Sequence, residues 1–488
     1  MKRNTTWILC TAALAALTAC QSTDIPLGSN IAIPQSFSQA EAVRGSSDLA
    51  RWWQHWHDPV LDSLIQQGLT QGHDVKIAVS RLNEVRALSQ AVVADSGPMV
   101  GLSGSGSVIR GHADNPLNDS ARKTAQQMAQ QFPPAAALGD SGYDIKGNHL
   151  AGGLVASWEP DIFGQKRSDA DAARYAALGQ QEQLYGAQML LAGDIAGHYF
   201  QARAAQGRLK VADDTVKVMQ RMVQYVAGRF QAGHVSGYEV NEAKVRLTAA
   251  EARRATIEAE YAAHVRSIAV LTGQVPQTFV LPASTVDVLA RQPDAPAGQT
   301  PAGMIERRPD LRAQAAQINA YAAKLAAAKA DLLPRFSIQF MGQGGRIGID
   351  GDSALKGWAN LLSVGIQVPI FTNGRIQANI AAADARLQTA LLNYDRQLLT
   401  ALGETDNAYQ SVEALRRQIG LLQTAHSQAV KHAADTEKLF RNGYKTLDGA
   451  LTAHLNEAQA RENLIQTRLA AAQMRVSLYK ALGGGWSE

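Results

Sequence analysis

Two histidines and an aspartate near the start of the chain are the side chains best spaced to hold a metal ion. His55, His57 and Asp58 supply imidazole and carboxylate groups, which are common ligands of transition metals. Three tryptophans lie in the same stretch, at the start of an amphipathic pattern: Trp52, Trp53 and Trp56. Large aromatic rings at this spacing favour a packed core, so we expect the two histidines to pack and predict no metal site.

Catalytic motifs are incomplete wherever they begin in this sequence. The run GLSGSG at Gly101 carries Ser105 where the nucleophile elbow G-x-S-x-G requires a glycine. The runs GSGSVI and GQGGRI lack the third glycine of a dinucleotide-binding loop, and neither a Walker loop nor an H-E-x-x-H motif occurs. The sequence therefore predicts a protein that is not an enzyme and needs no cofactor.

Cys20 is a residue whose surroundings predict a chemical modification. Basic Lys2 and Arg3 precede an apolar run, Trp7–Ala19, which at about a dozen residues is too short to span a bilayer as a resident helix. The run ends in LTAC, a small-residue cleavage site directly before cysteine. This pattern predicts a bacterial lipoprotein signal peptide over 1–19, with Cys20 acylated by palmitate and anchored to a membrane. The alternative is an ordinary signal peptide beside a chance cysteine.

The composition of the chain favours long helices and gives no support to a nucleic-acid partner. Hydrophobic residues make up 46% of the 488 residues but aromatic residues only 6%, and much of the rest is alanine, which suits closely packed helices. The net charge is +4, and no dense run of Lys and Arg occurs. After Cys20 no apolar stretch is long enough for a transmembrane helix, so a membrane crossing would need a closed β-barrel.

The chain is a tandem duplication. The run SWEPDIFGQKR at Ser157 matches QVPIFTNGR at Gln367, with an offset of about 209 residues that far exceeds solenoid repeat periods. The runs RFQAG at Arg229 and LFRNG at Leu439 match at nearly the same offset. The offset is larger upstream, which leaves about 28 extra residues between the two strands of the first copy, where surface loops tolerate insertions.

Each copy is predicted to form a helix, two strands joined by a loop, and a long helical hairpin. In the first copy, 51–275, we expect strands at about 98–110 and 150–163 and a hairpin at about 165–272. In the second copy, 303–484, we expect strands at about 334–343 and 358–371 and a hairpin at about 374–482. The remaining segments are a linker at 20–50, a proline-rich connection at 276–302 and a C-terminal tail at 485–488.

The strand signal is clearest in the second copy. In FSIQFMGQ, Phe336, Ile338 and Phe340 alternate with small or more polar residues, as in a strand with lipid on one face and water on the other. A half-buried hairpin of a water-soluble protein has the same pattern. Four strands cannot close a membrane barrel, which needs at least about eight. Either several subunits share one barrel or no barrel exists.

The two helical hairpins are unusually long. No proline occurs between Arg167 and Phe230 or between Arg375 and Phe440, and a helix of that length extends roughly 100 Å. The returning helices carry apolar stripes at a spacing of about 3.5 residues, which indicates coiled-coil packing. The stripe of the first copy is Val240, Ala243, Leu247, Ala250, Ile257, Tyr261, Ile268 and Leu271, and that of the second is Leu451, Leu455, Ala458, Ile465, Leu469, Ala472, Val476 and Tyr479.

Seven sequence runs, spread over nearly the whole chain, carry a resemblance to one known family. They are the lipobox at Cys20, RWWQHWHDPVLDSLI at Arg51, WEPDIFG at Trp158, RFQAGHVSGYEV at Arg229, IERRPDLRAQAAQI at Ile305, VPIFTNGR at Val368 and LFRNGYKTLDGAL at Leu439. They resemble the TolC-like outer membrane efflux family, specifically its lipoprotein, NodT-type branch. By resemblance to lipoproteins of that kind, Gln21 after the cysteine indicates the outer membrane.

This resemblance implies a mainly helical homotrimer with a membrane β part. Three protomers would give four strands each to one twelve-stranded β-barrel in the cell outer membrane, and their coiled-coil helices would form a periplasmic α-barrel. The implied function is a lipid-anchored channel that passively conducts small molecules. Its implied partners are an inner-membrane pump and a periplasmic adaptor (membrane fusion) protein, beside outer membrane lipid.

The resemblance also implies a gate at the periplasmic tip of the second hairpin. In this family a ring of aspartates from three protomers lies there, and like charges around one axis repel one another and bind cations. In NGYKTLDGALTAHL the family's Asp position carries Thr452. Asp448 is then the nearest carboxylate, with Lys445 as a pairing partner, and Leu447 and Leu451 are the apolar alternative. The plainer alternative for Asp448 is a solvated residue near a helix start.

The turns of both hairpins are candidate contacts for the adaptor. Gly233 and Gly443 lie at these turns, which we expect to be exposed. The plainer alternative is that both are ordinary turn glycines. Two other functions stay open from the sequence: a periplasmic adaptor-type lipoprotein, and an envelope scaffolding lipoprotein without a pore.

Overall fold

The computed structural model describes residues 29, 31–38, 45–132, 139, 142–349 and 355–486. Cys20 and the predicted signal peptide lie outside the described residues. The chain divides into two compact units. One combines Glu84–Ala177 with Ala320–Arg386, and the other combines the described residues up to Asn83 with Leu178–Asn319 and the chain from Leu387 onward.

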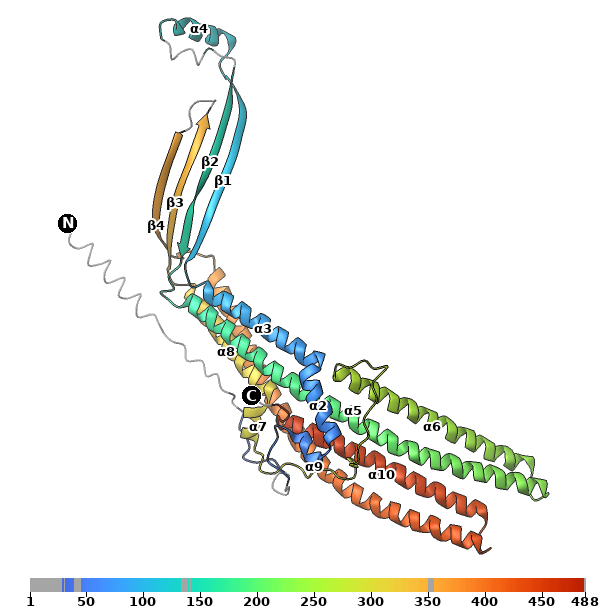
Figure 1. The fold of residues 1–488 in the computed structure, drawn as a ribbon. Coiled ribbons are helices and arrows are strands. Elements are labelled where there is room, and N and C mark those ends of the chain that lie inside the picture. Colours follow the sequence, from blue (N-terminus) through green and yellow to red (C-terminus); the bar gives the residue numbers. More distant parts are fainter. Residues whose placement is uncertain are drawn as a thin grey trace. The chain divides into compact units, whose positions relative to one another are not determined.

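The first of these units contains a four-stranded antiparallel sheet in the order β1-β2-β3-β4. Its strands are β1 (Met99–Asp114), β2 (Gly142–Trp158), β3 (Arg335–Ile349) and β4 (Leu355–Gln367). Figure 1 shows them side by side, so the two strands of each copy join those of the other copy in one sheet. The junction is the pairing of β2 with β3, where Trp158 lies opposite Ile338.

Residues directly opposite one another share a face of the sheet, and successive residues alternate between the faces. Where β1 begins and β4 ends, the two faces differ in polarity. One row across the four strands is apolar and consists of Val100, Ala156, Phe340 and Leu362. The adjacent row lies on the opposite face and consists of Met99, Ser157, Gln339 and Ser363. Many large apolar side chains of the sheet are exposed in the single chain, among them Leu102, Leu362 and Val364.

The connection between β1 and β2 is shorter than the loop expected between strands at about 98–110 and 150–163. β1 continues to Asp114 and β2 already begins at Gly142, because the ladder extends through glycine-rich residues whose side chains give little alternation. Between them lies an unexpected helix, α4 (Asp119–Ala129), which Asn118 caps by accepting a hydrogen bond from the amide of Ala121 at 2.9 Å. The β3 and β4 strands likewise run farther toward their connection than expected.

The helical elements of the two copies have equal lengths. α5 (Gln165–Gln231) and α9 (Arg375–Arg441) each contain 67 residues, and α6 (Gly237–Leu271) and α10 (Leu447–Ala481) each contain 35. Shorter helices precede the strands: η2 (Trp52–Trp56), α2 (Pro59–Gln71), α3 (His73–Ala94), α7 (Pro301–Arg307) and α8 (Pro309–Ala330). Among the described residues, no helix is long and apolar enough to cross a bilayer.

Glycines with positive φ mark the same three points in both copies. Gly164 and Gly374 precede the long helices, with φ of 78° and 79°. Gly233 and Gly443 follow those helices, and Gly273 and Gly483 follow the returning helices, again with positive φ. Only glycine adopts this backbone conformation without steric cost. The two copies recognised in the sequence therefore also share the backbone conformation of their turns.

An aromatic cluster fills the core of the second compact unit, which contains the two helical hairpins and is called the helical unit below. Trp52 stacks on Tyr479 with ring centroids 5.4 Å apart, and Trp56 packs on Phe200 at 5.3 Å. His55 joins this cluster, since its Nδ1 lies 3.2 Å from the Tyr479 hydroxyl. Burial lowers the pKa of His55, against the opposing charge of Asp48. His55 therefore packs, as expected from the neighbouring tryptophans, whereas His57 is exposed.

Candidate functional site

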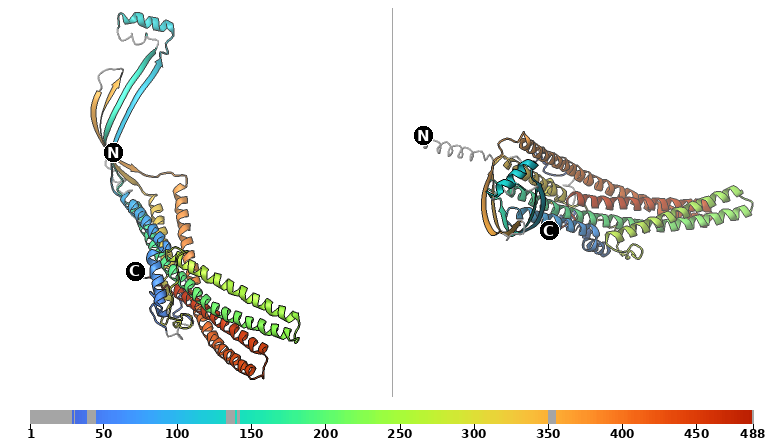
Figure 2. Two further views of the ribbon diagram at one scale, coloured as in Figure 1. Left: turned by 45° about the vertical axis from the view of Figure 1, so that its right-hand side comes forward. Right: turned by 90° about the horizontal axis from the view of Figure 1, so that it is seen from above.

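The turns of the two long hairpins have the same hydrogen-bond pattern. The amides of Gly233 and His234 donate to the carbonyls of Phe230 and Arg229, at 3.0 and 2.9 Å. In the second hairpin, the amides of Gly443 and Tyr444 donate to Phe440 and Leu439, at 2.9 and 2.8 Å. Both are Schellman motifs with glycine in the left-handed position. Figures 1 and 2 show the hairpins α5–α6 and α9–α10 side by side in the helical unit.

A capping residue starts each returning helix. Ser236 forms a capping box with Glu239 at the start of α6, and Thr446 accepts a hydrogen bond from the amide of Gly449 at the start of α10. Gly233 and Gly443 are exposed beside these caps. The turns are thus held by backbone hydrogen bonds and exposed to solvent.

The five residues singled out near the second turn divide into two groups. Lys445, Asp448 and Thr452 are exposed. Leu451 is fully buried in a cluster with Met222 of α5 and Ala243 of α6, and Leu447 packs against the same cluster. Within one chain the two leucines therefore hold the hairpins together, while the carboxylate of Asp448 faces solvent.

A buried carboxylate joins the two hairpins farther along. Glu462 of α10 is 4% exposed, and its Oε1 accepts hydrogen bonds from Arg208 Nε of α5 at 2.8 Å and from Gln466 at 2.9 Å. Arg253 of α6 lies 3.4 Å from the same oxygen, and Arg208 also donates to Glu260 at 2.7 Å. These contacts connect α5 and α6 of the first copy with α10 of the second.

A second and weaker link lies nearer the turns. Glu437 of α9 is largely buried, and Arg221 of α5 approaches its Oε1 to 3.4 Å. Arg441 lies 3.5 Å from that oxygen, and His454 of α10 lies 3.6 Å from Oε2.

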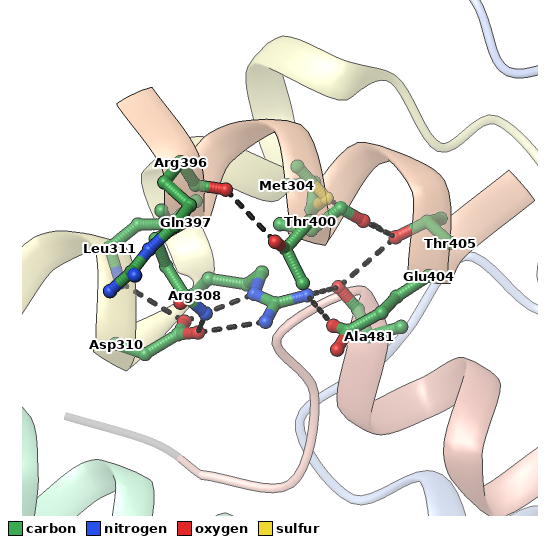
Figure 3. Close-up of polar contacts among 11 residues, drawn as sticks. Met304, Arg308, Asp310, Leu311, Arg396, Gln397, Thr400, Glu404, Thr405 and Ala481 are labelled. Atoms are coloured by element: carbon green, nitrogen blue, oxygen red, sulfur yellow. Dashed lines mark hydrogen bonds and ion pairs between the residues drawn. The ribbon is translucent and has the colours of Figure 1, made fainter. Parts of the chain in front are cut away.

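The third polar cluster surrounds Arg308, between α7 and α8 (Figure 3). Arg308 is 6% exposed, and its guanidinium donates to both carboxylate oxygens of Asp310, at 3.0 and 2.7 Å, and to Glu404 of α9 at 3.0 Å. It also reaches the carbonyl of Ala481 at the end of α10, at 3.3 Å. Arg308 thus ties the start of α8 to both helices of the second hairpin.

The electrostatics of this cluster keep Asp310 ionised. Burial alone would raise the pKa of Asp310, but hydrogen bonds and charge from Arg308, with a further hydrogen bond from Gln397, outweigh burial and lower the pKa. Burial likewise acts to lower the pKa of Arg308, and its bonds to Asp310 and Glu404 raise it. Arg308 and Asp310 therefore form a charged pair, and Arg308 also holds α9 and the end of α10 through Glu404 and Ala481.

Sequence reasoning missed these polar clusters, although a signal for two of their residues exists. The apolar stripe of α10 has a gap between Ala458 and Ile465, and Glu462 fills the core position in that gap. A charged residue at a core position of a coiled coil requires a partner. Arg308 lies inside the run IERRPDLRAQAAQI, which drew attention for its resemblance and not for its chemistry.

Comparison with known proteins places this architecture in one family. The family model described as "Outer membrane efflux protein" matches residues 64–274 and 301–484. The chain is 27% identical over 471 residues to the pyoverdine export outer membrane protein OpmQ of Pseudomonas aeruginosa, covering 96% of this chain and 95% of that protein. It is 25% identical to the cation efflux system protein CusC of Escherichia coli, covering 97% of each chain.

Solved structures show the same fold. The outer-membrane channel OprN superposes with a TM-score of 0.74 at 26% identity, over 94% of this chain and 99% of that chain. The open state of the Neisseria gonorrhoeae MtrE outer membrane channel superposes with a TM-score of 0.75 at 22% identity, over 94% and 96%. The predicted fold class, mainly helical with a four-stranded antiparallel sheet, is confirmed. The alternatives of an adaptor or a scaffold are set aside. The chain belongs to the outer membrane efflux protein family: it is an outer membrane channel component of efflux pumps and not an enzyme.

Proposed function

We propose that three copies of this chain form one passive exit duct of a tripartite efflux system. The observation that carries the proposal is the open sheet. Within the part of the chain that the structure describes, β1 and β4 are the outer strands and their outer edges have no partner strand. Exposed edges of this length favour pairing with another chain. Pairing β4 of one copy with β1 of the next, three times, would close the sheet.

The polarity of the sheet supports the same assembly. The row from Val100 to Leu362 would face lipid, and the row from Met99 to Ser363 would face the water-filled interior. No chemistry is needed in such a duct, since the inner-membrane pump supplies the energy. The names of the relatives refer to pyoverdine and to cations, and such different cargoes suit a duct that leaves selection to its pump.

The exposed hairpin turns are the proposed contacts for a periplasmic adaptor protein. Gly233 and Gly443 hold these turns in the left-handed conformation with an open surface around them. A rigid turn loses little conformational entropy when a partner binds. The adaptor in turn would connect the duct to an inner-membrane pump.

Asp448 is the proposed gate residue. It is exposed in the first turn of α10, where the helix dipole stabilises its negative charge. Three such carboxylates around one axis would repel one another and attract cations. Lys445 and Thr452 are exposed next to it, whereas Leu447 and Leu451 are engaged in packing within the chain, which favours Asp448 over an apolar constriction.

Lipid anchoring through Cys20 completes the proposal and would place the chain in the lipoprotein, NodT-type branch. It is supported by the apolar run and the LTAC site that precede the cysteine. The mature protein would be attached to the outer membrane by acyl chains. Cys20→Ala is expected to abolish incorporation of labelled palmitate. Label retained in that variant would contradict acylation at this residue.

Two measurements test the assembly and its gate. An unheated detergent gel of the outer membrane fraction should show a trimer that boiling converts to a monomer, and a monomer released by salt washing would overturn the proposal.

Reconstituted trimers of Asp448→Ala should conduct more ions than wild type at low divalent cation concentration, because the like charges at the tip are removed. Asp435→Ala, which changes an exposed aspartate of α9, is the matched control. Equal conductance of wild type and Asp448→Ala would remove this residue from the gate.

A further inference from the structure

Two histidines meet between the helices of the first hairpin. His198 of α5 and His264 of α6 approach with their Nδ1 atoms 3.2 Å apart, and their ring centroids are separated by 5.4 Å. Both side chains are half-buried. At this distance one Nδ1 donates a proton and the other accepts it, so at least one imidazole is neutral. Burial, together with the charge of His198 and against that of Glu260, lowers the pKa of His264.

The hairpin fold does not require this pair. His264 occupies a core position of the α6 stripe, between Tyr261 and Ile268. In the second copy, whose helices have the same lengths, the equivalent positions carry Ala408 and Met474. Two apolar side chains therefore suffice for the packing of such a hairpin, and the imidazoles are a property of the first copy alone.

Carboxylates lie one helical turn before each histidine. Asp194 precedes His198 and Glu260 precedes His264 by one turn, so each carboxylate lies on the same helix face as its imidazole. Asp194 is exposed and Glu260 is half-buried. Glu260 receives a hydrogen bond from Arg208 through Oε2. Because α5 and α6 run antiparallel, the two carboxylates lie on opposite sides of the histidine pair along the hairpin axis.

We propose that His198 and His264 form a binding site for a divalent late transition metal, with Cu²⁺ bound more tightly than Zn²⁺. Imidazole nitrogen suits these ions, and the order of affinities follows the general preference for Cu²⁺. Two nitrogens bound to one tetrahedral zinc at about 2.05 Å lie about 3.3 Å apart. The observed Nδ1–Nδ1 distance of 3.2 Å therefore matches the nitrogen separation in such a site, and binding requires only that the rings tilt until both lone pairs meet at the metal.

Binding replaces the proton between the rings by the metal. Both Nδ1 lone pairs coordinate the ion and each ring then carries its proton on Nε2. A neutral donor ring therefore shifts its Nδ1 proton to Nε2 through water, and a charged ring releases one proton to solvent. Among the described residues no group of three or more His, Cys, Asp or Glu side chains is already assembled around a metal position. Water, with Asp194 or Glu260 after side-chain rotation, completes the coordination. The ion then clamps α5 to α6.

The test is a Cu²⁺ titration of the purified full-length protein in detergent after removal of metals by a chelator. Calorimetry should give one strong site per chain, and the electron paramagnetic resonance spectrum of bound Cu²⁺ should show coupling to two nitrogens. The variant His198→Ala/His264→Met reproduces the apolar pair of the second copy, so it should fold. Loss of the chelating pair should weaken Cu²⁺ binding by at least about tenfold and remove the nitrogen coupling.

The control is His234→Ala, which removes an exposed histidine in the turn of the same hairpin. It should bind Cu²⁺ as wild type does. Affinity should also fall as the solution is made more acidic, because the metal and protons compete for the same nitrogens. A wild-type titration without a saturable Cu²⁺ site would overturn the proposal. So would a double variant, shown to be folded by its melting curve, that keeps both the affinity and the nitrogen coupling.

Discussion

Arg208 of α5 donates a hydrogen bond from Nε to Oε1 of Glu462 of α10 over 2.8 Å, and this contact joins the first copy of the duplicated chain to the second. The carboxylate is almost fully buried and also faces Arg253 of α6. Charges taken out of water need such partners. The position of one hairpin against the other therefore depends on a polar contact as well as on the apolar stripes.

Replacing Glu462 with alanine should destabilise the helical unit. The substitution removes the shared acceptor of Arg208, Arg253 and Gln466, although Arg208 keeps its contact to Glu260. We expect a loss of about 1–3 kcal/mol in the free energy of unfolding, measured by thermal or denaturant unfolding. Glu258→Ala is the control, because that carboxylate is exposed on α6 and pairs only with Arg254 in the described structure. Equal stability of the two variants would contradict a structural role for the buried link.

Alanine at Gly443 should destabilise the protein through its backbone. With φ of 78° this residue is left-handed, a conformation that costs a residue with a Cβ about 1–2 kcal/mol. Gly420→Ala provides the matched comparison, since Gly420 lies inside α9 and an added Cβ there meets no described atom within 4 Å. That variant should gain up to about 1 kcal/mol from higher helix propensity. If Gly443→Ala and Gly420→Ala shift the unfolding midpoint in the same direction, the backbone explanation for Gly443 is wrong.

Asp310 should make stability sensitive to acid. Its pKa in the folded protein is below the ordinary value, so its contribution is fully present above the pKa of the unfolded chain, about 3.9, and is lost as the pH falls through the folded value. Asp310→Asn should therefore be less stable than wild type near neutral pH, and the gap should narrow below about pH 4. Unfolding followed from pH 7 to pH 3 measures the gap. A gap that stays constant with pH would show that the charge of Asp310 is not what matters.

His264 should add a second pH dependence in a milder range. Its folded pKa is lowered from 6.5, so the unfolded chain takes up a proton that the folded protein resists, and stability falls as the pH drops from about 6.5 toward the folded pKa. Without metal, His264→Met should flatten this part of the stability profile. His234→Ala should leave it unchanged. A slope in His264→Met as steep as in wild type would assign the dependence to other groups.

Local patterns predicted much of this fold. Strand alternation around Phe336, the proline-free helices and the repeated turn glycines are each set by neighbouring residues, and such local preferences survive in the structure as β3, α5 and α9. The ends of strands were less predictable. β1 reaches Asp114 because its partner continues, and α4 follows in a segment whose composition indicates turns.

The candidate sites likewise combine features that the sequence predicts with contacts that only the tertiary structure shows. The sequence alone determined the duplication, the long hairpins and the positions of Gly233 and Gly443, because helix period and turn chemistry depend on residues close together in the chain. Only the tertiary structure decided that Leu451 is buried while Asp448 is exposed, that Arg208 meets Glu462, and that His198 meets His264. Those outcomes depend on how each helix is rotated about its axis against its neighbour, which is fixed by packing among residues far apart in the sequence.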